Sequence, residues 1–146
     1  MKKMLVGVIY GSVSDESVMA DCLKILDKLD IGYEVNVMSA HRTPAEVADY
    51  SAKAASRGIK VIIAGAGLAA HLAGAVAANT KLPVIGVPLS AGTLGGLDAL
   101  LSTVQMPPGV PVATVAIGKY GAKNAAWLAA RIIALSDEEV AAALSK

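Results

Sequence analysis

Short apolar runs alternate with longer amphipathic stretches along the chain. The short runs predict β-strands, and four of the five are almost continuously apolar, which is typical of parallel strands covered on both faces. The longer stretches repeat apolar residues at helical spacing and predict helices between the strands. The predicted strands cover residues 5–10, 33–38, 60–64, 83–87 and 112–117, and the predicted helices cover residues 14–29, 43–57, 69–79, 93–104 and 121–135.

Capping signals mark the ends of two helices. Thr43 and Glu46 form a capping box at the start of the second predicted helix, and Gly58 ends that helix. Ser136 and Glu139 form another capping box and predict a short last helix.

This alternation predicts an α/β fold, a three-layer α/β/α sandwich of the flavodoxin-like or Rossmann-like kind with a five-stranded parallel sheet. Residues 1–146 are expected to form a single domain, because no linker or repeat interrupts the pattern. Right-handed crossovers place every strand-to-helix loop at one edge of such a sheet, where ligands bind. The chemistry is therefore expected in those loops.

Composition narrows the class of protein. Hydrophobic residues make up 55% of the chain and charged residues only 17%, which excludes intrinsic disorder. The net charge of +1 leaves no electrostatic footprint for nucleic acid or for a membrane surface. Between positions 61 and 118 the only charged residues are Lys81 and Asp98.

The uncharged stretch 61–80 is long enough to span a bilayer, but its composition argues against a membrane helix. It contains three glycines, His71 and Asn79, and the next uncharged stretch, 99–118, contains three prolines. The apolar run at the N-terminus is too short for a signal peptide. We therefore expect a cytoplasmic protein that does not enter membranes and buries apolar surface in a homo-oligomer.

Cysteine and histidine are scarce, which limits the available chemistry. The single cysteine, Cys22, lies among apolar residues at helical spacing and is predicted to be a reduced core thiol. The only histidines are His41 and His71, so no histidine-rich metal site is expected, and no carboxylate cluster suggests a metal site of another kind.

The loops after the first two predicted strands carry the polar residues. Ser12, Ser14 and Asp15 follow the first strand, where a Gly-Ser turn exposes backbone N–H groups and hydroxyls to a phosphate, although ordinary helix capping explains them as well. His41 and Arg42 follow the second strand. Arg42 suits a phosphate or carboxylate and His41 suits acid/base work, unless the two are a solvated surface pair.

The third loop, residues 65–71, matches the glycine fingerprint of dinucleotide sites, but no acidic residue stands about 20 positions further on to hold a ribose. Without a dinucleotide site, the loop is expected to be a glycine loop that lets a ligand approach closely. His71 is predicted one turn into the next helix, where it is either a pocket residue or a core histidine. Ser90 in the fourth loop has no partnered base and no nucleophile-elbow motif.

Several strings resemble one known family. GSVSD, SAHRTP, AGAGLAAHLAG, PVIGVP and VQMPPGVPVATVAIG occur in order and resemble the PurE family of N5-carboxyaminoimidazole ribonucleotide mutases, in its bacterial class. The resemblance implies an isomerase of purine synthesis that moves a carboxylate from the exocyclic nitrogen of an aminoimidazole ribonucleotide to ring carbon C4. It implies CO2 as a trapped intermediate, no metal or organic cofactor, and a homo-oligomer, expected to be an octamer.

The resemblance also implies roles for individual residues. His41 matches the general acid/base that takes the C4 proton, Asp15 matches the residue that holds the ribose hydroxyls, and Arg42 matches a phosphate ligand. Leu68 and Ala73 depart from the family, which commonly has glycine and proline there. The implied substrate-binding residues are Ser12, Ser14, Asp15, Ser39, Arg42, Gly67, His71 and Leu72.

Two other functions remain open at this point. The same pocket would suit a carboxylase that adds CO2 directly to aminoimidazole ribonucleotide. A chain of a different class, a ribonucleotide-binding module without catalysis, would need the same phosphate and ribose contacts but no acid/base residue.

Overall fold

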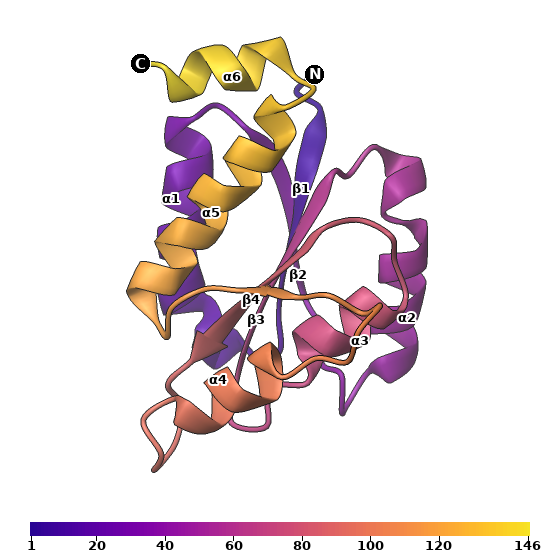
Figure 1. Cartoon of the computed structure of the whole chain (residues 1–146), viewed down its shortest axis with the longest axis vertical. Coiled ribbons are helices and arrows are strands. Elements are labelled where there is room, and N and C mark those ends of the chain that lie inside the picture. The colour runs from indigo at the N-terminus through magenta and orange to yellow at the C-terminus, as the bar shows by residue number, and fades with distance from the viewer.

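The computed structural model describes residues 1–146 and has a parallel sheet at its centre (Figure 1). Its strands are β1 (Met4–Tyr10), β2 (Gly32–Val37), β3 (Val61–Gly67), β4 (Val84–Leu89) and β5 (Ala113–Thr114). They lie in the order β2-β1-β3-β4-β5, and every neighbouring pair is parallel. The predicted α/β fold with a five-stranded parallel sheet is confirmed.

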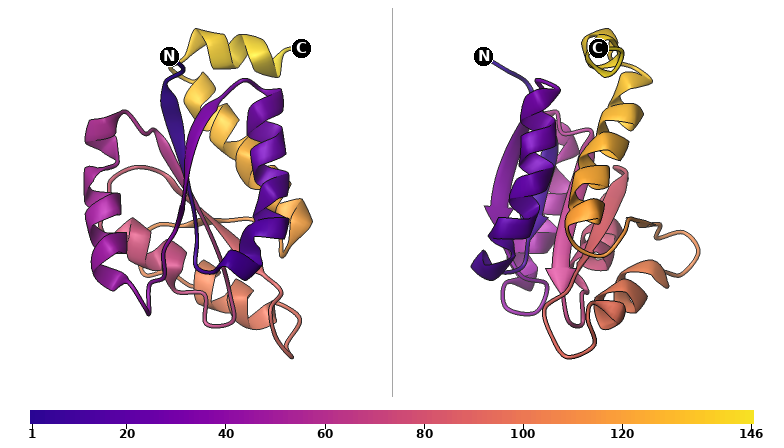
Figure 2. Two further views of the ribbon diagram at one scale, coloured as in Figure 1. Left: turned by 180° about the vertical axis from the view of Figure 1, so that it is seen from behind. Right: turned by 90° about the vertical axis from the view of Figure 1, so that its left-hand side faces the viewer.

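Helices cover both faces of the sheet. They are α1 (Glu16–Lys28), α2 (Pro44–Lys53), α3 (Leu72–Ala78), α4 (Leu97–Val104), α5 (Lys119–Ala134) and α6 (Glu138–Leu144), with 3-10 turns at Val13–Asp15 and Ala55–Arg57. Helices α1 and α5 pack on one face and α2 and α3 on the other, which makes three layers (Figure 2). Helix α4 lies at one end of the molecule, and both chain termini lie at the other (Figure 1).

None of these helices combines the length and the apolar character that crossing a bilayer requires. The long uncharged stretch 61–80 is divided between β3, a loop and α3. Its apolar residues therefore lie in the layers of the sandwich.

The last strand is shorter than predicted. Only Ala113 and Thr114 of the predicted strand 112–117 pair with β4. Prolines precede this segment, and β5 is an edge strand with a neighbour on one side only, so little enforces regular pairing. Val115 and Gly118 still donate to the carbonyls of Gly86 and Pro88, at 3.1 and 2.9 Å, in an irregular pattern.

Several helix starts differ from the prediction. Helix α4 begins at Leu97 instead of residue 93, because Gly95 and Gly96 have φ values of 62° and 90°, outside the helical region. Helix α3 begins at Leu72, so His71 is the N-cap residue and not a residue one turn inside the helix.

Both predicted capping boxes are wrong in their side-chain contacts. Thr43 is the N-cap of α2, but its hydroxyl bonds to Ser39 and not to the helix. In the last helix the cap is Asp137, whose carboxylate accepts from Val140 N at 3.0 Å. Helix α2 ends at Lys53, earlier than predicted, and Gly58, with φ at 95°, ends the 3-10 turn Ala55–Arg57 that follows it.

The larger part of the core lies between the sheet, α1 and α5. Cys22 is fully buried there, which confirms the predicted core thiol, and burial raises the pKa of this thiol to about 12. Helix α5 presents a face of small side chains to this core, so it approaches the sheet and α1 closely. The face consists of Ala122, Ala125, Ala126, Ala129 and Ala130.

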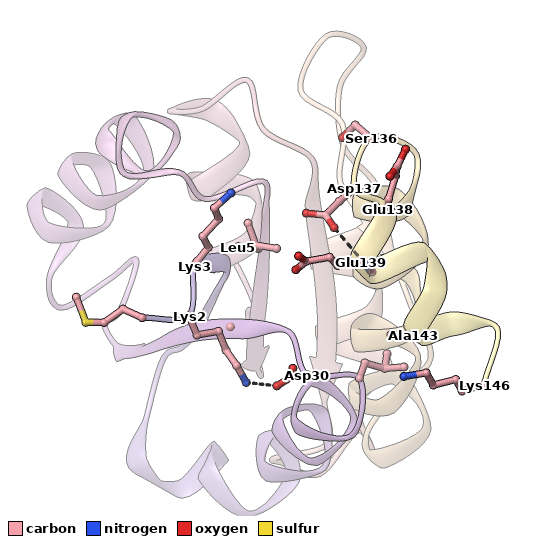
Figure 3. Close-up of a pocket in the computed structure, with 14 residues that line it drawn as sticks. Lys2, Lys3, Leu5, Asp30, Ser136, Asp137, Glu138, Glu139, Ala143 and Lys146 are labelled. Carbon is pink, nitrogen blue, oxygen red and sulfur yellow. Dashed lines mark hydrogen bonds and ion pairs between the residues drawn. The ribbon is translucent and has the colours of Figure 1, made fainter.

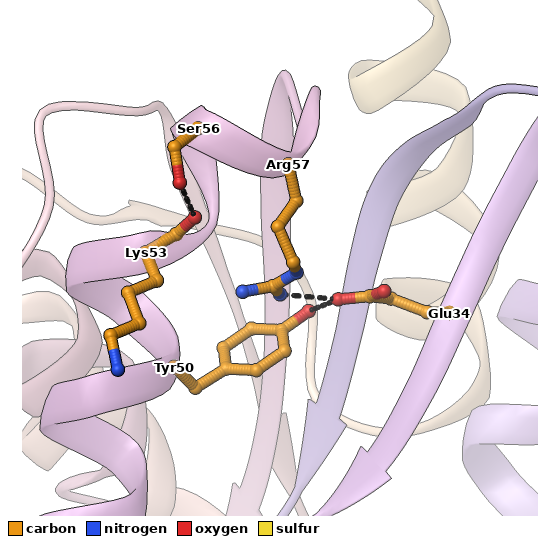
Figure 4. Close-up of polar contacts among 5 residues, drawn as sticks. All are labelled: Glu34, Tyr50, Lys53, Ser56 and Arg57. Atoms are coloured by element: carbon orange, nitrogen blue, oxygen red, sulfur yellow. Dashed lines mark hydrogen bonds and ion pairs between the residues drawn. The ribbon is translucent and has the colours of Figure 1, made fainter.

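A polar cluster fastens α2 to the edge strand β2. The Tyr50 hydroxyl donates to Glu34 Oε1 at 2.7 Å, and Arg57 Nη2 donates to the same oxygen at 2.6 Å (Figure 4). The Arg57 guanidinium also lies over the Tyr50 ring, 4.7 Å from its centroid. Partial burial acts to raise the pKa of Glu34, but the hydrogen bonds from Tyr50 and Arg57 outweigh it and lower that pKa.

Replacing Tyr50 with phenylalanine should lower the free energy of unfolding by about 1 kcal/mol at neutral pH, because one hydrogen bond to a carboxylate is lost. Because the pKa of Glu34 is lowered in the fold, its carboxylate stabilises the folded protein fully above the ordinary pKa of 4.5. This stabilisation is lost as the pH falls through the lower pKa that Glu34 has in the folded protein. The difference between wild type and Tyr50→Phe in urea unfolding should shrink over that acid range.

Tyr120→Phe is the matched control, because Tyr120 is 77% exposed. Its free energy of unfolding should stay within about 0.5 kcal/mol of wild type. Equal effects of the two substitutions would contradict a stabilising role for the Tyr50–Glu34 bond.

Candidate active site

A pocket of about 430 Å³ opens at the carboxyl ends of β1, β2 and β3. Three strand-to-helix loops form most of it, as the parallel topology predicts. All nine residues named from the sequence line this pocket. They are Ser12, Ser14, Asp15, Ser39, His41, Arg42, Gly67, His71 and Leu72.

The first loop is held by hydroxyl contacts. Ser12 Oγ accepts from Ser14 N at 3.3 Å and lies 2.9 Å from Ser14 Oγ, so Ser12 caps the 3-10 turn that precedes α1. The Asp15 side chain makes no capping hydrogen bond, although Asp15 is the N-cap residue of α1. The Asp15 carboxylate is therefore free to accept hydrogen bonds from a ligand.

Asp15 is only partly exposed, and this affects its titration. Partial burial raises the pKa of the Asp15 carboxyl, and hydrogen bonding of this carboxyl with the Ser12 backbone opposes the rise. A partly desolvated carboxylate gains more from hydroxyl donors than a hydrated one, which favours a neutral, hydroxyl-rich group of the ligand at this position.

Ser39 organises the second loop. Its hydroxyl accepts from the backbone N–H of His41 at 3.2 Å and of Arg42 at 3.1 Å, while its own N–H donates to Thr43 Oγ1 at 2.9 Å. These bonds wind residues 39–43 into one compact turn before α2. Because the hydroxyl already accepts two bonds, Ser39 acts on a ligand mainly by positioning His41 and Arg42.

The two histidines of the chain meet in this pocket. His41 Nε2 lies 2.6 Å from His71 Nδ1, and the rings are arranged edge to face with centroids 4.8 Å apart. One of these nitrogens must be the acceptor of the bond, so at least one ring is unprotonated there. Both side chains are exposed to the pocket. The pair can therefore exchange a proton with a bound ligand.

The third loop supplies the apolar side of the pocket. Leu72 is buried beneath it, and Gly67 comes so close to the fourth loop that a Cβ there would lie 2.6 Å from the Ala91 Cβ. Leu68 and Ala91 also line the pocket, and neither was among the predicted site residues. The sequence signal for Leu68 is its departure from the family beside the glycine loop, and Ala91 carries no chemical signal.

A larger cavity of about 770 Å³ lies at the opposite end of the molecule, between the N-terminus and α6 (Figure 3). Its charged groups are partly engaged, since Lys2 pairs with Asp30 at 2.6 Å and Asp137 caps α6. It contains neither histidine nor arginine. Both histidines and Arg42 line the smaller pocket instead.

Comparison with known proteins adds to this geometry. Residues 5–146 match the family described as AIR carboxylase. The protein named N5-carboxyaminoimidazole ribonucleotide mutase from Bacillus subtilis (strain 168) is 57% identical over 142 residues, covering 97% of this chain and 88% of the relative. The protein of the same name from Mycobacterium leprae (strain TN) is 61% identical over 139 residues, covering 95% and 80%.

A solved structure agrees in fold. The crystal structure of Treponema denticola PurE is similar with a TM-score of 0.86 and 32% sequence identity. The similarity covers 97% of this chain and 87% of that one.

Proposed function

The chain belongs to the AIR carboxylase family, and from this we propose that it is an N5-carboxyaminoimidazole ribonucleotide mutase. It is an isomerase that converts the N-carboxylated ribonucleotide into 4-carboxy-5-aminoimidazole ribonucleotide during purine synthesis. One structural observation carries this proposal: the His41–His71 pair lies in the same pocket as Asp15 and Arg42. The named relatives support it independently.

The polar loops orient the ribonucleotide. Arg42 forms charge-assisted hydrogen bonds to the phosphate, helped by the hydroxyls of Ser12 and Ser14. Asp15 accepts from the ribose hydroxyls. With these two ends fixed, the imidazole ring lies toward Gly67 and the histidine pair. A volume of about 430 Å³ is within the range of pockets for ligands of this size.

The reaction begins with loss of CO2 from the exocyclic nitrogen. The carboxylate is anionic and CO2 is neutral, so the apolar side of the pocket around Leu72 favours release and slows hydration of CO2. Ring carbon C4 then attacks CO2, and His41 takes the C4 proton as general base. His71 accepts or donates at the shared hydrogen bond and so holds the His41 ring in position.

Two parallel assays test the proposal. One supplies the N-carboxylated ribonucleotide without bicarbonate, and the other supplies aminoimidazole ribonucleotide with bicarbonate. Faster formation of the C4-carboxylated product in the first assay is expected. Saturable turnover only in the second would assign the direct carboxylase instead, and binding without turnover in either would assign a non-catalytic module.

We also propose that the protein is a cytoplasmic homo-octamer. Leu94, Leu97, Leu101 and Val104 lie at helical spacing along α4 and just before it, and each is 42–62% exposed. Asp98 is the only charged residue in positions 82–118, so this face has no charge to match to a different partner. A second copy of the chain offers the same apolar face, and eight copies is the number that the family resemblance implies.

Glutamate at both Leu97 and Leu101 should break this assembly, because like charges would face each other in a desolvated contact. Light scattering after size exclusion should give eight times the 14.7 kDa chain mass for wild type and a smaller species for the double variant. Leu135→Glu, at a leucine that is 88% exposed at the end of α5, should leave the mass unchanged. A monomeric wild type would overturn this part of the proposal.

A further inference from the structure

His71 depends on its backbone for its place in the pocket. It is the N-cap residue of α3, yet its side chain makes no capping hydrogen bond to that helix. Its ring is bonded instead to His41, with 2.6 Å between His71 Nδ1 and His41 Nε2, and the residue is exposed rather than packed in the core. A shift of the backbone at residues 70–71 would therefore move this nitrogen away from His41.

The loop before His71 needs an anchor from another element. Leu68 has a φ of 56°, a left-handed backbone conformation that residues other than glycine rarely adopt. Such a conformation persists only where its surroundings hold it. Residues 68–71 belong to no helix or strand, so the regular hydrogen bonds of the sheet do not supply this support.

Ser102 of α4 is the anchor. Its hydroxyl accepts a hydrogen bond from Ala70 N at 2.9 Å and lies 3.4 Å from the carbonyl oxygen of Leu68. The same hydroxyl donates to the carbonyl of Asp98 at 2.6 Å, one turn back along α4. Ala70 is only 2% exposed, so water has little access to replace the bond that its N–H makes with Ser102.

Helix α4 is itself fixed against the sheet at this point. Thr103, the next residue, is buried, and a Cβ built on Gly86 of β4 would lie 2.5 Å from Thr103 Cγ2. The Thr103 hydroxyl donates to the carbonyl of Ala99 at 2.7 Å and makes only a long contact, 3.5 Å, with the carbonyl of Ala70. Ser102 therefore supplies the short hydrogen bond from this packed helix to the loop.

We propose that Ser102 is a positioning residue of the reaction: by holding the N–H of Ala70, it keeps the His71 ring at hydrogen-bonding distance from His41. This inference rests on the proposed mutase function, in which His41 takes the C4 proton. Ser102 does not line the pocket, so it acts through His71 and not on the ribonucleotide. Its loss should therefore slow the chemical step and leave substrate binding in place.

The first measurement needs no substrate. The chain has only two histidines, so labelling histidine with ¹⁵N gives signals from two rings, which the variant His71→Asn assigns. The spectra are recorded at about pH 8, where an ordinary histidine is neutral. In Ser102→Ala the signals of His41 Nε2 and His71 Nδ1 should move toward those of a free imidazole, because their shared hydrogen bond is lost. The other nitrogen of each ring should move less.

Kinetics test the consequence for the reaction. Ser102→Ala should lower kcat by about 30-fold and change KM by less than about threefold, because a misplacement of about 1 Å can cost about 10²-fold in rate while the phosphate and ribose contacts are untouched. In the His71→Asn background the same substitution should lower kcat by less than about twofold, because the residue that Ser102 positions is gone. Ser102→Thr keeps the hydroxyl and should retain most of kcat.

Ser51→Ala is the matched control. The Ser51 hydroxyl is buried in α2 and donates to the carbonyl of Val47 at 2.6 Å, the same distance as from Ser102 to the carbonyl of Asp98, but this bond stays within one helix. Ser51→Ala should keep the wild-type kcat and histidine signals. Alanine favours helices more than serine does, so both alanine variants should fold. Ser102→Cys, with a weaker acceptor in the same place, is a second variant and should lie between wild type and Ser102→Ala.

The outcomes separate the positioning role from the function on which it rests. Unchanged nitrogen signals in Ser102→Ala would overturn the positioning role, whatever the turnover. Equal losses of kcat from Ser102→Ala with and without His71 would overturn it as well, because Ser102 would then act on the fold as a whole. Wild type that does not turn over the N-carboxylated ribonucleotide would overturn the mutase function and with it the role of Ser102 in the reaction, even where the nitrogen signals shift.

Discussion

Turnover of the N-carboxylated ribonucleotide should fall by about 1,000-fold when His41 is replaced by asparagine, because a positioned acid/base group contributes about 10² to 10⁴ in rate. The asparagine keeps a polar group of similar reach but has no titratable nitrogen. The loop itself should survive, since its hydrogen bonds run from the backbone of His41 and Arg42 to Ser39 Oγ. Product formation by absorbance gives kcat for both proteins.

Ligand binding is the control for this experiment. Calorimetry with aminoimidazole ribonucleotide should give a Kd within about threefold of wild type, because the proposed phosphate and ribose contacts are untouched. Retained binding with lost turnover would end the interpretation as a non-catalytic module. Full turnover in His41→Asn would instead exclude His41 as the proton acceptor.

Alanine at Gly121 should destabilise the fold by about 3 kcal/mol, the upper end of the usual cost of overpacking. Gly121 is buried in the first turn of α5, and a Cβ there would overlap the carbonyl oxygen of Ala116 and lie 2.6 Å from its carbon. Alanine improves helix propensity by about 1 kcal/mol, so the clash must exceed this gain. Because α5 carries the alanine face of the core, its displacement opens that whole layer.

Asn124→Ala isolates the propensity effect, since Asn124 lies three residues further along α5 and is exposed. It should stabilise slightly, whereas Gly121→Ala should lower Tm by about 10 °C. Both are measured by thermal and urea unfolding. If both substitutions instead stabilised the fold, the Ala116 carbonyl would have to move away from the new methyl at little cost in free energy.

The sheet was predictable because buried parallel strands leave a continuous apolar signal. The predicted strands 60–64 and 83–87 each begin one residue before β3 and β4, and both observed strands run two or more residues further, to Gly67 and Leu89. Those last residues pair with each other across the sheet, and pairing between strands distant in sequence leaves no local pattern. The predicted fifth strand, 112–117, was too long for the same reason, since only Ala113 and Thr114 pair with β4.

The candidate site divides in a similar way. The polar residues on the first two loops could be placed at one sheet edge, because parallel topology alone brings strand ends together. The bond between His41 and His71 could not be foreseen, since it depends on where α3 begins. The hydroxyls of Thr43 and Ser102 were also missed as loop anchors, because each bonds to backbone groups that only the folded loops bring near.

Cys22 has a practical consequence for these experiments. A thiol that is fully buried, with its pKa raised to about 12, reacts with an added disulfide or alkylating reagent only when the layer between α1 and α5 opens. As the sole cysteine, it makes the labelling rate a direct measure of how often that layer is breached. The rate should rise sharply in Gly121→Ala and stay at the wild-type value in His41→Asn, which separates a damaged core from a disabled pocket in a single reaction.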